Sequence, residues 1–226
     1  MSTEIILSQL RPYQTLHDLW WGRLIDRTGV KGWLDCSRQL YYTMRSTAPL
    51  LRFAAAEAIR ADADSNRHEL NAFTEWATEH AEEEQEHHLW FLDDLSTVGI
   101  SAEEINENIP HTAILELLGV QFSLISTTHP VGVLGYFLAM ECSPSNPDRV
   151  KSLAENLGLP DEVLRTILYH TVVDQDHRRE IIAISDKYSS HPTHRAAMTT
   201  GAIAALTGWS LYFHERQKIG APNQAG

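Results

Sequence analysis

The 226-residue sequence has only two cysteines, Cys36 and Cys142, and no long apolar run. Two cysteines do not make the disulfide framework of a small secreted protein. The most apolar stretch, Val131 to Met140, is about half of the roughly 20 residues that span a bilayer. The first residues contain no basic segment followed by an apolar one, so they do not predict a signal peptide. These absences predict a soluble cytoplasmic protein with no membrane partner.

Basic residues are also scarce. The chain has 18 Lys and Arg against 30 Asp and Glu, for a formal net charge of −12, and the basic residues are scattered. Because phosphate binding requires clustered Lys and Arg, this balance argues against a nucleic-acid partner.

Alternating β-branched residues, the pattern of strands, are missing, whereas helical periodicity dominates. Helices are predicted at about residues 6–26, 33–63, 67–97, 113–127, 131–142, 148–157 and 161–188, with a last one ending near 217. Pro49 should kink or break the second. We expect an all-α bundle of about seven to eight helices, in a single domain over residues 1–226 with a tail frayed from about residue 218.

Two segments in this pattern have the same arrangement of polar residues, His-x-x-x-acid-x-x-His. On an α-helix, at about 100° per residue, offsets of four and seven residues fall within an arc of about 60°. Each segment therefore aims three potential metal ligands in one direction. The six residues are His80, Glu84 and His87 in the first segment and His170, Asp174 and His177 in the second.

Imidazole and carboxylate together suit iron, manganese, zinc and copper, whereas calcium and magnesium prefer oxygen alone. Helical bundles hold two iron or manganese ions through Glu-x-x-His pairs on facing helices, and Glu84 with His87 and Asp174 with His177 have this spacing. Two such faces opposing each other, joined by a further carboxylate, would hold two transition-metal ions.

Glu141 could supply that carboxylate. It ends an apolar helix, where a charge is costly unless it is neutralised. The alternative is an exposed last residue before the Ser143-Pro144 break. Glu57 is a further possible ligand or a surface acid. The acids around His80 also fit a solvated helix face, whereas apolar neighbours favour burial of His170.

At these residues the chain resembles the haem-oxygenase-like di-iron oxidases and oxygenases, called iron-containing redox enzymes or grouped with TenA-like proteins. The resemblance rests on Gly-x-x-Gly-Tyr-Phe-Leu-Ala-Met-Glu141 and on His170-x-x-x-Asp174-x-x-His177, and the helical order extends it over most of the chain. Residues His87, Glu141, His170, Asp174 and His177 match the family's ligand positions. Position 80 departs from the family's pattern, because the family commonly has Glu there and this chain has His. Glu84 offers a carboxylate one helical turn later.

The resemblance implies a haem-oxygenase-like fold, two iron ions cycling between Fe2+ and Fe3+, and O2 as co-substrate. It implies oxidation of a small molecule, such as an amino acid or related carboxylic acid, by N-oxygenation, desaturation, C–C cleavage or nitrile formation in a biosynthetic pathway. A homodimer and an electron donor are further expected partners. A substrate carboxylate could be received by Tyr41, Tyr42, Arg45 or Arg178, although surface or packing roles fit these residues too.

Four other functions remain open at the sequence level. A metal-free TenA-type hydrolase would use Cys142 as its nucleophile. A ferritin-like di-iron protein would use Glu57 and the acid-x-x-His pairs. A haem protein would use His17, and an interaction protein would need no site.

Overall fold

The structure is a computed structural model of the chain. It describes residues 2–65, 69–142 and 146–219, without the side chains of Ser2, Ser65, Val173, Asp174 and Ile219. The predicted frayed tail lies outside the described residues from 220 onwards. Every regular element within the described ranges is a helix, which confirms the all-α prediction.

The described residues form ten α-helices, more than the seven to eight predicted. The helices are α1 (Ser2–Thr28), α2 (Val30–Ser65), α3 (Asn71–Glu83), α4 (His87–Ser96), α5 (Ala102–Glu107), α6 (Thr112–Thr127), α7 (Val133–Met140), α8 (Pro147–Leu157), α9 (Arg165–Tyr188) and α10 (Pro192–Ile219). Two short 3-10 helices, η1 (Pro130–Gly132) and η2 (Asp161–Leu164), precede α7 and α9.

The excess over the prediction has two sources. The helix predicted at 67–97 is divided into α3 and α4, and the short helix α5 was not predicted. Ser101 begins α5, because its hydroxyl accepts the Glu104 N–H at 3.1 Å. Helix α2, in contrast, continues through Pro49 instead of breaking there. Burial of Leu50 and Leu51 next to Pro49 offsets the lost backbone hydrogen bond.

The division between α3 and α4 follows from a run of acids. Residues 82, 83, 84 and 86 are all Glu, and like charges one helical turn apart destabilise a helix. The Gln85 N–H bonds to the carbonyl of Glu82 at 3.4 Å, three residues back instead of four. A new helix then begins at His87. Side chains before and after this turn therefore do not share one straight helical face.

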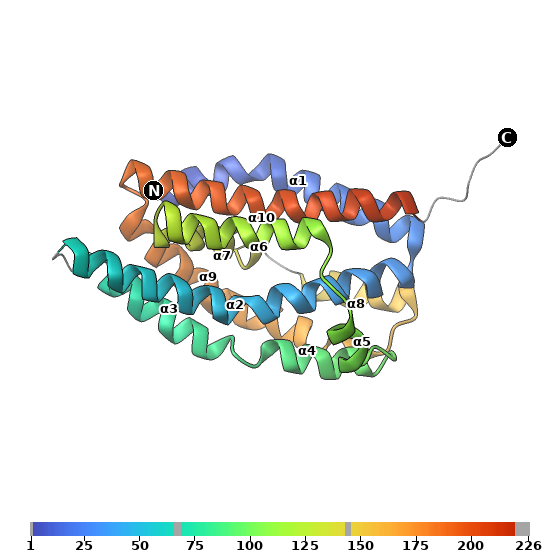
Figure 1. Cartoon of the computed structure of the whole chain (residues 1–226). Coiled ribbons are helices and arrows are strands. Elements are labelled where there is room, and N and C mark those ends of the chain that lie inside the picture. Colours follow the sequence, from blue (N-terminus) through green and yellow to red (C-terminus); the bar gives the residue numbers. More distant parts are fainter. Residues whose placement is uncertain (1, 66–68, 143–145, 220–226) are drawn as a thin grey trace.

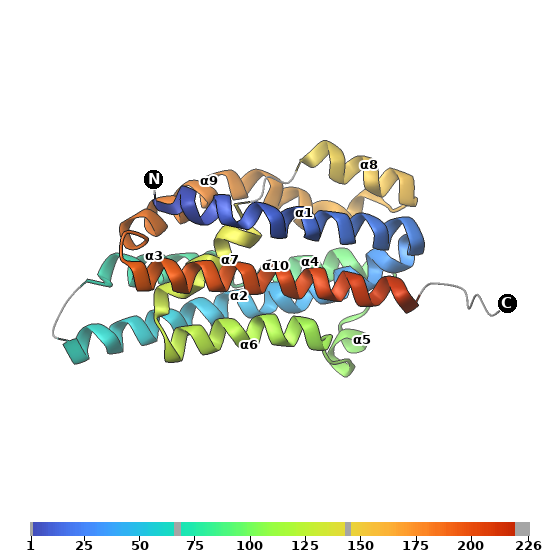
Figure 2. The same ribbon diagram turned by 90° about the horizontal axis from the view of Figure 1, so that it is seen from above.

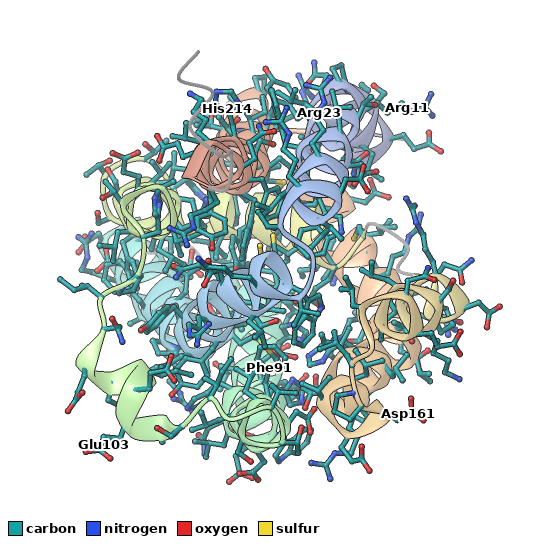
Figure 3. The ribbon with its side chains drawn as sticks, turned by 90° about the vertical axis from the view of Figure 1, so that its right-hand side faces the viewer. Arg11, Arg23, Phe91, Glu103, Asp161 and His214 are labelled. Carbon is teal, nitrogen blue, oxygen red and sulfur yellow. The ribbon has the colours of Figure 1, made fainter. Side chains whose placement is uncertain are left out.

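Helices α1 and α10 lie side by side, and α10 also packs on α6 and α7 (Figures 1 and 2). Helix α2 packs on α3 and α6, and α4 packs on α9. Seen from one end, Phe91 of α4 points into the bundle, while Glu103 of α5 and Asp161 of η2 lie at its periphery (Figure 3). No helix in the described ranges is both long and apolar enough to cross a membrane.

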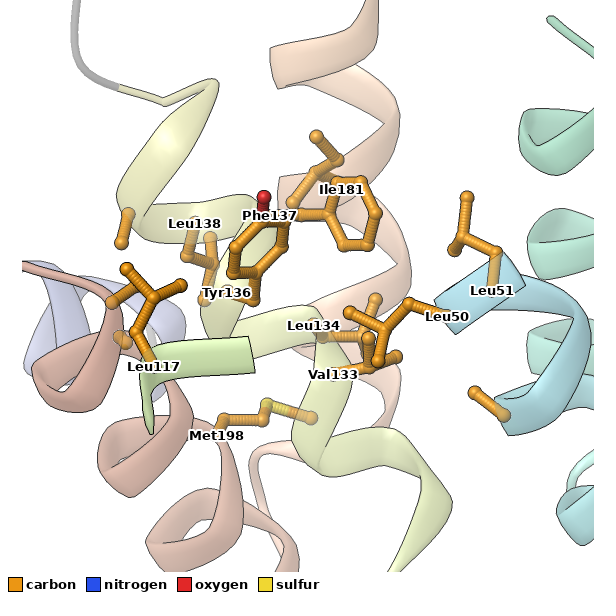
Figure 4. Packing of buried hydrophobic residues seen from close by; sticks show 14 of the residues in the cluster. Leu50, Leu51, Leu117, Val133, Leu134, Tyr136, Phe137, Leu138, Ile181 and Met198 are labelled. Atoms are coloured by element: carbon orange, nitrogen blue, oxygen red, sulfur yellow. The ribbon is translucent and has the colours of Figure 1, made fainter. Parts of the chain in front are cut away.

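Helix α7 lies inside the bundle. All residues from Val133 to Ala139 are buried, and Figure 4 shows Leu134 and Phe137 among side chains of α2 and α9 such as Leu50 and Ile181. Such complete burial explains the continuous apolar sequence of this helix. The chain leaves α7 at Glu141, so α7 carries one carboxylate into the interior.

Three histidines gather where η1 meets the start of α10. The ring centroids of His129 and His194 are 3.9 Å apart, and those of His191 and His194 are 4.4 Å apart. The Nδ1 atom of His129 accepts the Val131 N–H at 3.3 Å and so caps η1. Burial, and then the neighbouring His194 and His191, lower the pKa of His129 to about 4, against a smaller opposing effect of Asp62.

We expect the protein to lose stability as the pH falls from about 6.5 to about 4. The unfolded chain binds a proton on His129 through this interval, whereas the folded chain does not, so acid favours unfolding. His129→Asn keeps a capping acceptor but cannot titrate. Between pH 7 and pH 4.5 the His129→Asn variant should lose about 1–2 kcal/mol less unfolding free energy than the parent protein. Urea unfolding at both pH values measures this, and equal losses in parent and variant would contradict it.

Candidate metal centre

Two groups of three metal-ligating side chains lie where α3 ends, α4 begins and α9 passes both. We call them the His80 group (His80, Glu83 and His177) and the His87 group (Glu84, His87 and His170). Within each group the ligand atoms lie within 4.8 Å of one another. Because Glu83 and Glu84 are consecutive residues, the turn between α3 and α4 joins the two groups.

In the His80 group, one carboxylate oxygen faces two imidazoles. Glu83 Oε2 lies 3.4 Å from His80 Nδ1 and 3.4 Å from His177 Nε2. Both histidines are buried, whereas the Glu83 side chain is 55% exposed. The group therefore has a buried nitrogen side and a carboxylate at the protein surface.

Glu141 lies against the other nitrogen of each of these imidazoles. Its Oε1 is 3.6 Å from His80 Nε2, and its Oε2 is 3.3 Å from His177 Nδ1. Each ring thus stands between the two carboxylates. A carboxylate behind a metal-binding imidazole fixes its tautomer and orientation, and Glu141 is placed to do this for both rings.

The same contacts shift the pKa values of Glu141, His80 and His177. Burial alone would raise the pKa of Glu141, but the imidazoles of His177 and His80 outweigh burial and lower it. Burial alone would lower the pKa of each histidine, and Glu141 outweighs it and raises both. Glu84 adds to this rise at both rings, which shows that the two groups interact electrostatically.

The contacts within the His87 group are shorter than those within the His80 group. His87 Nδ1 lies 2.9 Å from Glu84 Oε1 and 3.1 Å from His170 Nε2. The Nδ1 of His170 is 2.8 Å from the carbonyl of Thr166. Because a carbonyl only accepts, Nδ1 of His170 carries the ring proton, and its Nε2 lone pair faces the group.

A buried acid on α4 fixes the position of α9 at this group. Asp94 accepts the Thr166 N–H at 2.6 Å and pairs with Arg165 Nε at 2.9 Å. Thr166 in turn orients His170 through its carbonyl. Asp94 follows His87 by seven residues and therefore lies on the same side of α4.

Aromatic rings contact both groups, and they are buried at the His80 group and partly exposed at the His87 group. Trp76 stacks on His80 with centroids 5.2 Å apart, and Phe137 meets the same ring edge-on at 5.3 Å. Both are buried and keep water from this side. Trp90 and Tyr169 contact His87 at 4.7 and 5.8 Å and are partly exposed, so the His87 group lies closer to the surface.

One buried nitrogen of the His80 group supports a bound cation. Nδ1 of His80, which faces the Glu83 carboxylate, has no hydrogen-bond partner of good geometry among the described residues. Buried polar atoms are rarely left so, and each such atom calls for an explanation. Each group has two imidazoles and one carboxylate, the set typical of non-haem Fe(II) sites with open positions. The residues present therefore fit iron.

The structure places the seven predicted ligands as follows. Five belong to the two groups, and Glu141 contacts the His80 group. The side chain of Asp174 lies outside the described residues, so its role stays a prediction. Glu57, the possible extra ligand, pairs with Arg60 at 2.6 Å and is in neither group.

Glu83 was not predicted as a ligand, and the divided helix explains this. A straight helix favours residues spaced like 80, 84 and 87, whereas the turn after Glu83 directs consecutive acids to separate groups. The signal in the sequence was the acidic run itself, which is unfavourable within one helix.

The predicted substrate residues lie in two places. Tyr42 and Arg45 line a cavity that contains no member of either group. Arg178 is half-buried next to His177 on α9. Cys142, the alternative nucleophile, is buried beside Glu141.

Comparisons with known proteins agree with this geometry. The model of a family described as iron-containing redox enzyme matches residues 35–210. A domain of unknown function with a heme oxygenase-like fold from Shewanella denitrificans OS217 superposes with a TM-score of 0.75 at 16% identity, over 97% of this chain and 98% of that one. A CADD-like protein of unknown function from Nostoc punctiforme PCC 73102 gives 0.68 at 15% identity, over 100% and 96%. The search of curated proteins gives no match.

At such identities the two solved structures show the fold alone, and they confirm the haem-oxygenase-like fold that the resemblance implied. The family match covers most of the chain, including every residue of both groups. This chain belongs to the family of iron-containing redox enzymes.

Proposed function

We propose that the protein is a non-haem di-iron oxidase or oxygenase that uses O2 on a small molecule. The observation that carries the proposal is the pair of adjoining groups, each with two imidazoles and one carboxylate. The His80 group would hold one iron ion and the His87 group the other. Bound iron would supply the change of oxidation state and the open coordination positions that reaction with O2 requires.

The surrounding residues have separate tasks in this proposal. Trp76 and Phe137 exclude water from the His80 group, which protects a reactive site from side reactions. Glu141 orients His80 and His177, and the Thr166 carbonyl orients His170. Burial raises the pKa of Tyr136, so its hydroxyl stays protonated near Glu141 and Glu84.

The proposed substrate is an amino acid or a related carboxylic acid, in a biosynthetic reaction. Arg178, which is half-buried and follows His177 on α9, would receive the substrate carboxylate. The metal-free hydrolase is not proposed, because it would give the two groups of imidazoles and carboxylates no role.

Anaerobic titration of the iron-free protein with Fe(II) should give two ions per chain. His177→Ala should lose the ion of the His80 group and His170→Ala that of the His87 group, so each variant should bind one. His88→Gln is the matched control, because His88 packs on Tyr41 at 5.9 Å, belongs to neither group and should leave two ions bound. Mössbauer spectra count the iron environments.

The catalytic part of the proposal is tested by O2 uptake of the two-iron protein with a panel of amino acids and other carboxylic acids. Uptake that depends on one of these compounds and disappears in both His→Ala variants is expected. Binding of fewer than two ions by the parent, or iron binding unaffected by both variants, would contradict the assignment.

A further inference from the structure

A cavity of about 360 Å³ opens between α2, α5 and α6. Helix α2 contributes Tyr42, Arg45, Ser46 and Pro49, and helix α6 contributes Leu115, Leu118 and Phe122. No lining residue belongs to the His80 or His87 group. The cavity is therefore separate from the candidate metal centre.

The spacing of the lining residues makes the cavity an elongated groove. Positions 42, 45 and 49 on α2 and positions 115, 118 and 122 on α6 each follow one helical face. Helices α2 and α6 run in the same direction here (Figure 1). Seven residues of helix span about 10 Å, which sets the length of each wall.

Fixed contacts join the walls of the groove near each end. At one end the Tyr42 hydroxyl donates to the carbonyl of Ile105 at 2.7 Å, and it lies 3.2 Å from that of Asn108. This holds α5 and the following turn against α2. At the other end Phe53 of α2 meets Phe122 of α6 with ring centroids 5.5 Å apart.

The groove is apolar along α6 and carries one positive charge on α2. Leu115 and Phe122 are 46% and 37% exposed, so their apolar surface faces open space. Arg45 is exposed and has no acidic partner within the described ranges, whereas Arg38 and Arg60 on the same helix pair with Glu104 and Glu57. In a chain of net charge −12, an unpaired Arg beside apolar side chains is complementary to an anion with an apolar body.

We propose that this groove binds a small amphipathic carboxylate. Its carboxylate would lie on the guanidinium of Arg45, and its apolar body would cover Leu115, Leu118 and Phe122. The single cation favours a monoanion, and walls of about 10 Å suit an apolar body of about that length. This proposal is independent of the proposed function, because it needs no metal.

Octanoate is a suitable probe, and isothermal titration calorimetry of the full chain measures its binding. We expect one octanoate per chain. Arg45→Gln should weaken binding at least tenfold, because it removes a charge-assisted contact. Arg60→Gln, the same change on the same helix at a paired and exposed arginine, should leave the affinity unchanged.

A second variant tests the apolar wall. Phe122→Ser should also weaken octanoate binding, and octan-1-ol should bind the parent more weakly than octanoate. Equal affinity for octanoate in the parent and Arg45→Gln, or no binding at millimolar octanoate, would overturn the proposal. Either result would leave the iron titration unaffected, so the two proposals fail separately.

Discussion

Glu141→Gln is expected to weaken iron binding at the His80 group by roughly 10- to 100-fold, while the His87 group keeps its affinity. The change preserves the size of the side chain and removes its charge. Glu141 contacts the nitrogens of His80 and His177 that face away from Glu83, so it acts on a bound ion through the two rings. Removing its charge leaves both rings less basic and free to change tautomer.

A measurement without metal gives this prediction a second readout. In the parent, Glu141 raises the pKa of His177 although burial opposes it. In Glu141→Gln the effect of burial remains, so the pKa of His177 should fall. NMR titration of the imidazole signals of the iron-free protein follows this directly.

Glu57→Gln is the matched control for both readouts. It makes the same carboxylate-to-amide change in a residue that pairs with Arg60 and touches neither group. It should leave the iron affinity and the pKa of His177 unchanged. If Glu141→Gln bound iron as tightly as the parent, Glu141 would have no part in the centre.

Much of the candidate centre followed from local spacing. The His-x-x-x-acid-x-x-His segments indicated His80, His87, His170 and His177, although residues 80–87 do not form the one straight helix that the spacing assumed. The apolar run before Glu141 likewise indicated that the helix leading to Glu141 is buried. Both features can be recognised within about ten residues of sequence.

What spacing did not predict depends on contacts between distant segments. Glu83 joins the His80 group because α3 ends there, and Asp94 fixes Thr166 across the α4–α9 contact. Tyr42 and Arg45, the predicted substrate residues on α2, line a groove that α5 and α6 complete and that contains no member of either group. Helical periodicity carries no information on which helices become neighbours.

Gly135→Ala is expected to lower the unfolding free energy by about 3 kcal/mol, the upper end of the usual cost of overpacking. A Cβ at this position would lie 1.8 Å from the carbonyl oxygen of Met198 and 2.9 Å from the nitrogen of Ala202. Both atoms belong to the backbone of α10, so no side chain can move aside. Helices α7 and α10 would have to separate.

Gly119→Ala provides a control with the opposite sign. Gly119 is an exposed residue inside α6, and its Cβ would meet nothing within 4 Å. Alanine there should stabilise the protein by about 1 kcal/mol, because it favours the helix. Thermal unfolding should show a Tm lower by roughly 6–12 °C for Gly135→Ala and slightly higher for Gly119→Ala.

The Gly135 variant also connects the packing of the bundle to the metal centre. Glu141 leaves α7 at its C-terminal end, so a displaced α7 moves the carboxylate away from His80 and His177. Any folded fraction of Gly135→Ala should therefore bind iron weakly at the His80 group and normally at the His87 group, whose residues lie on α4, α9 and the turn before α4. Normal Tm and normal iron binding together would show that α7 does not need its close contact with α10.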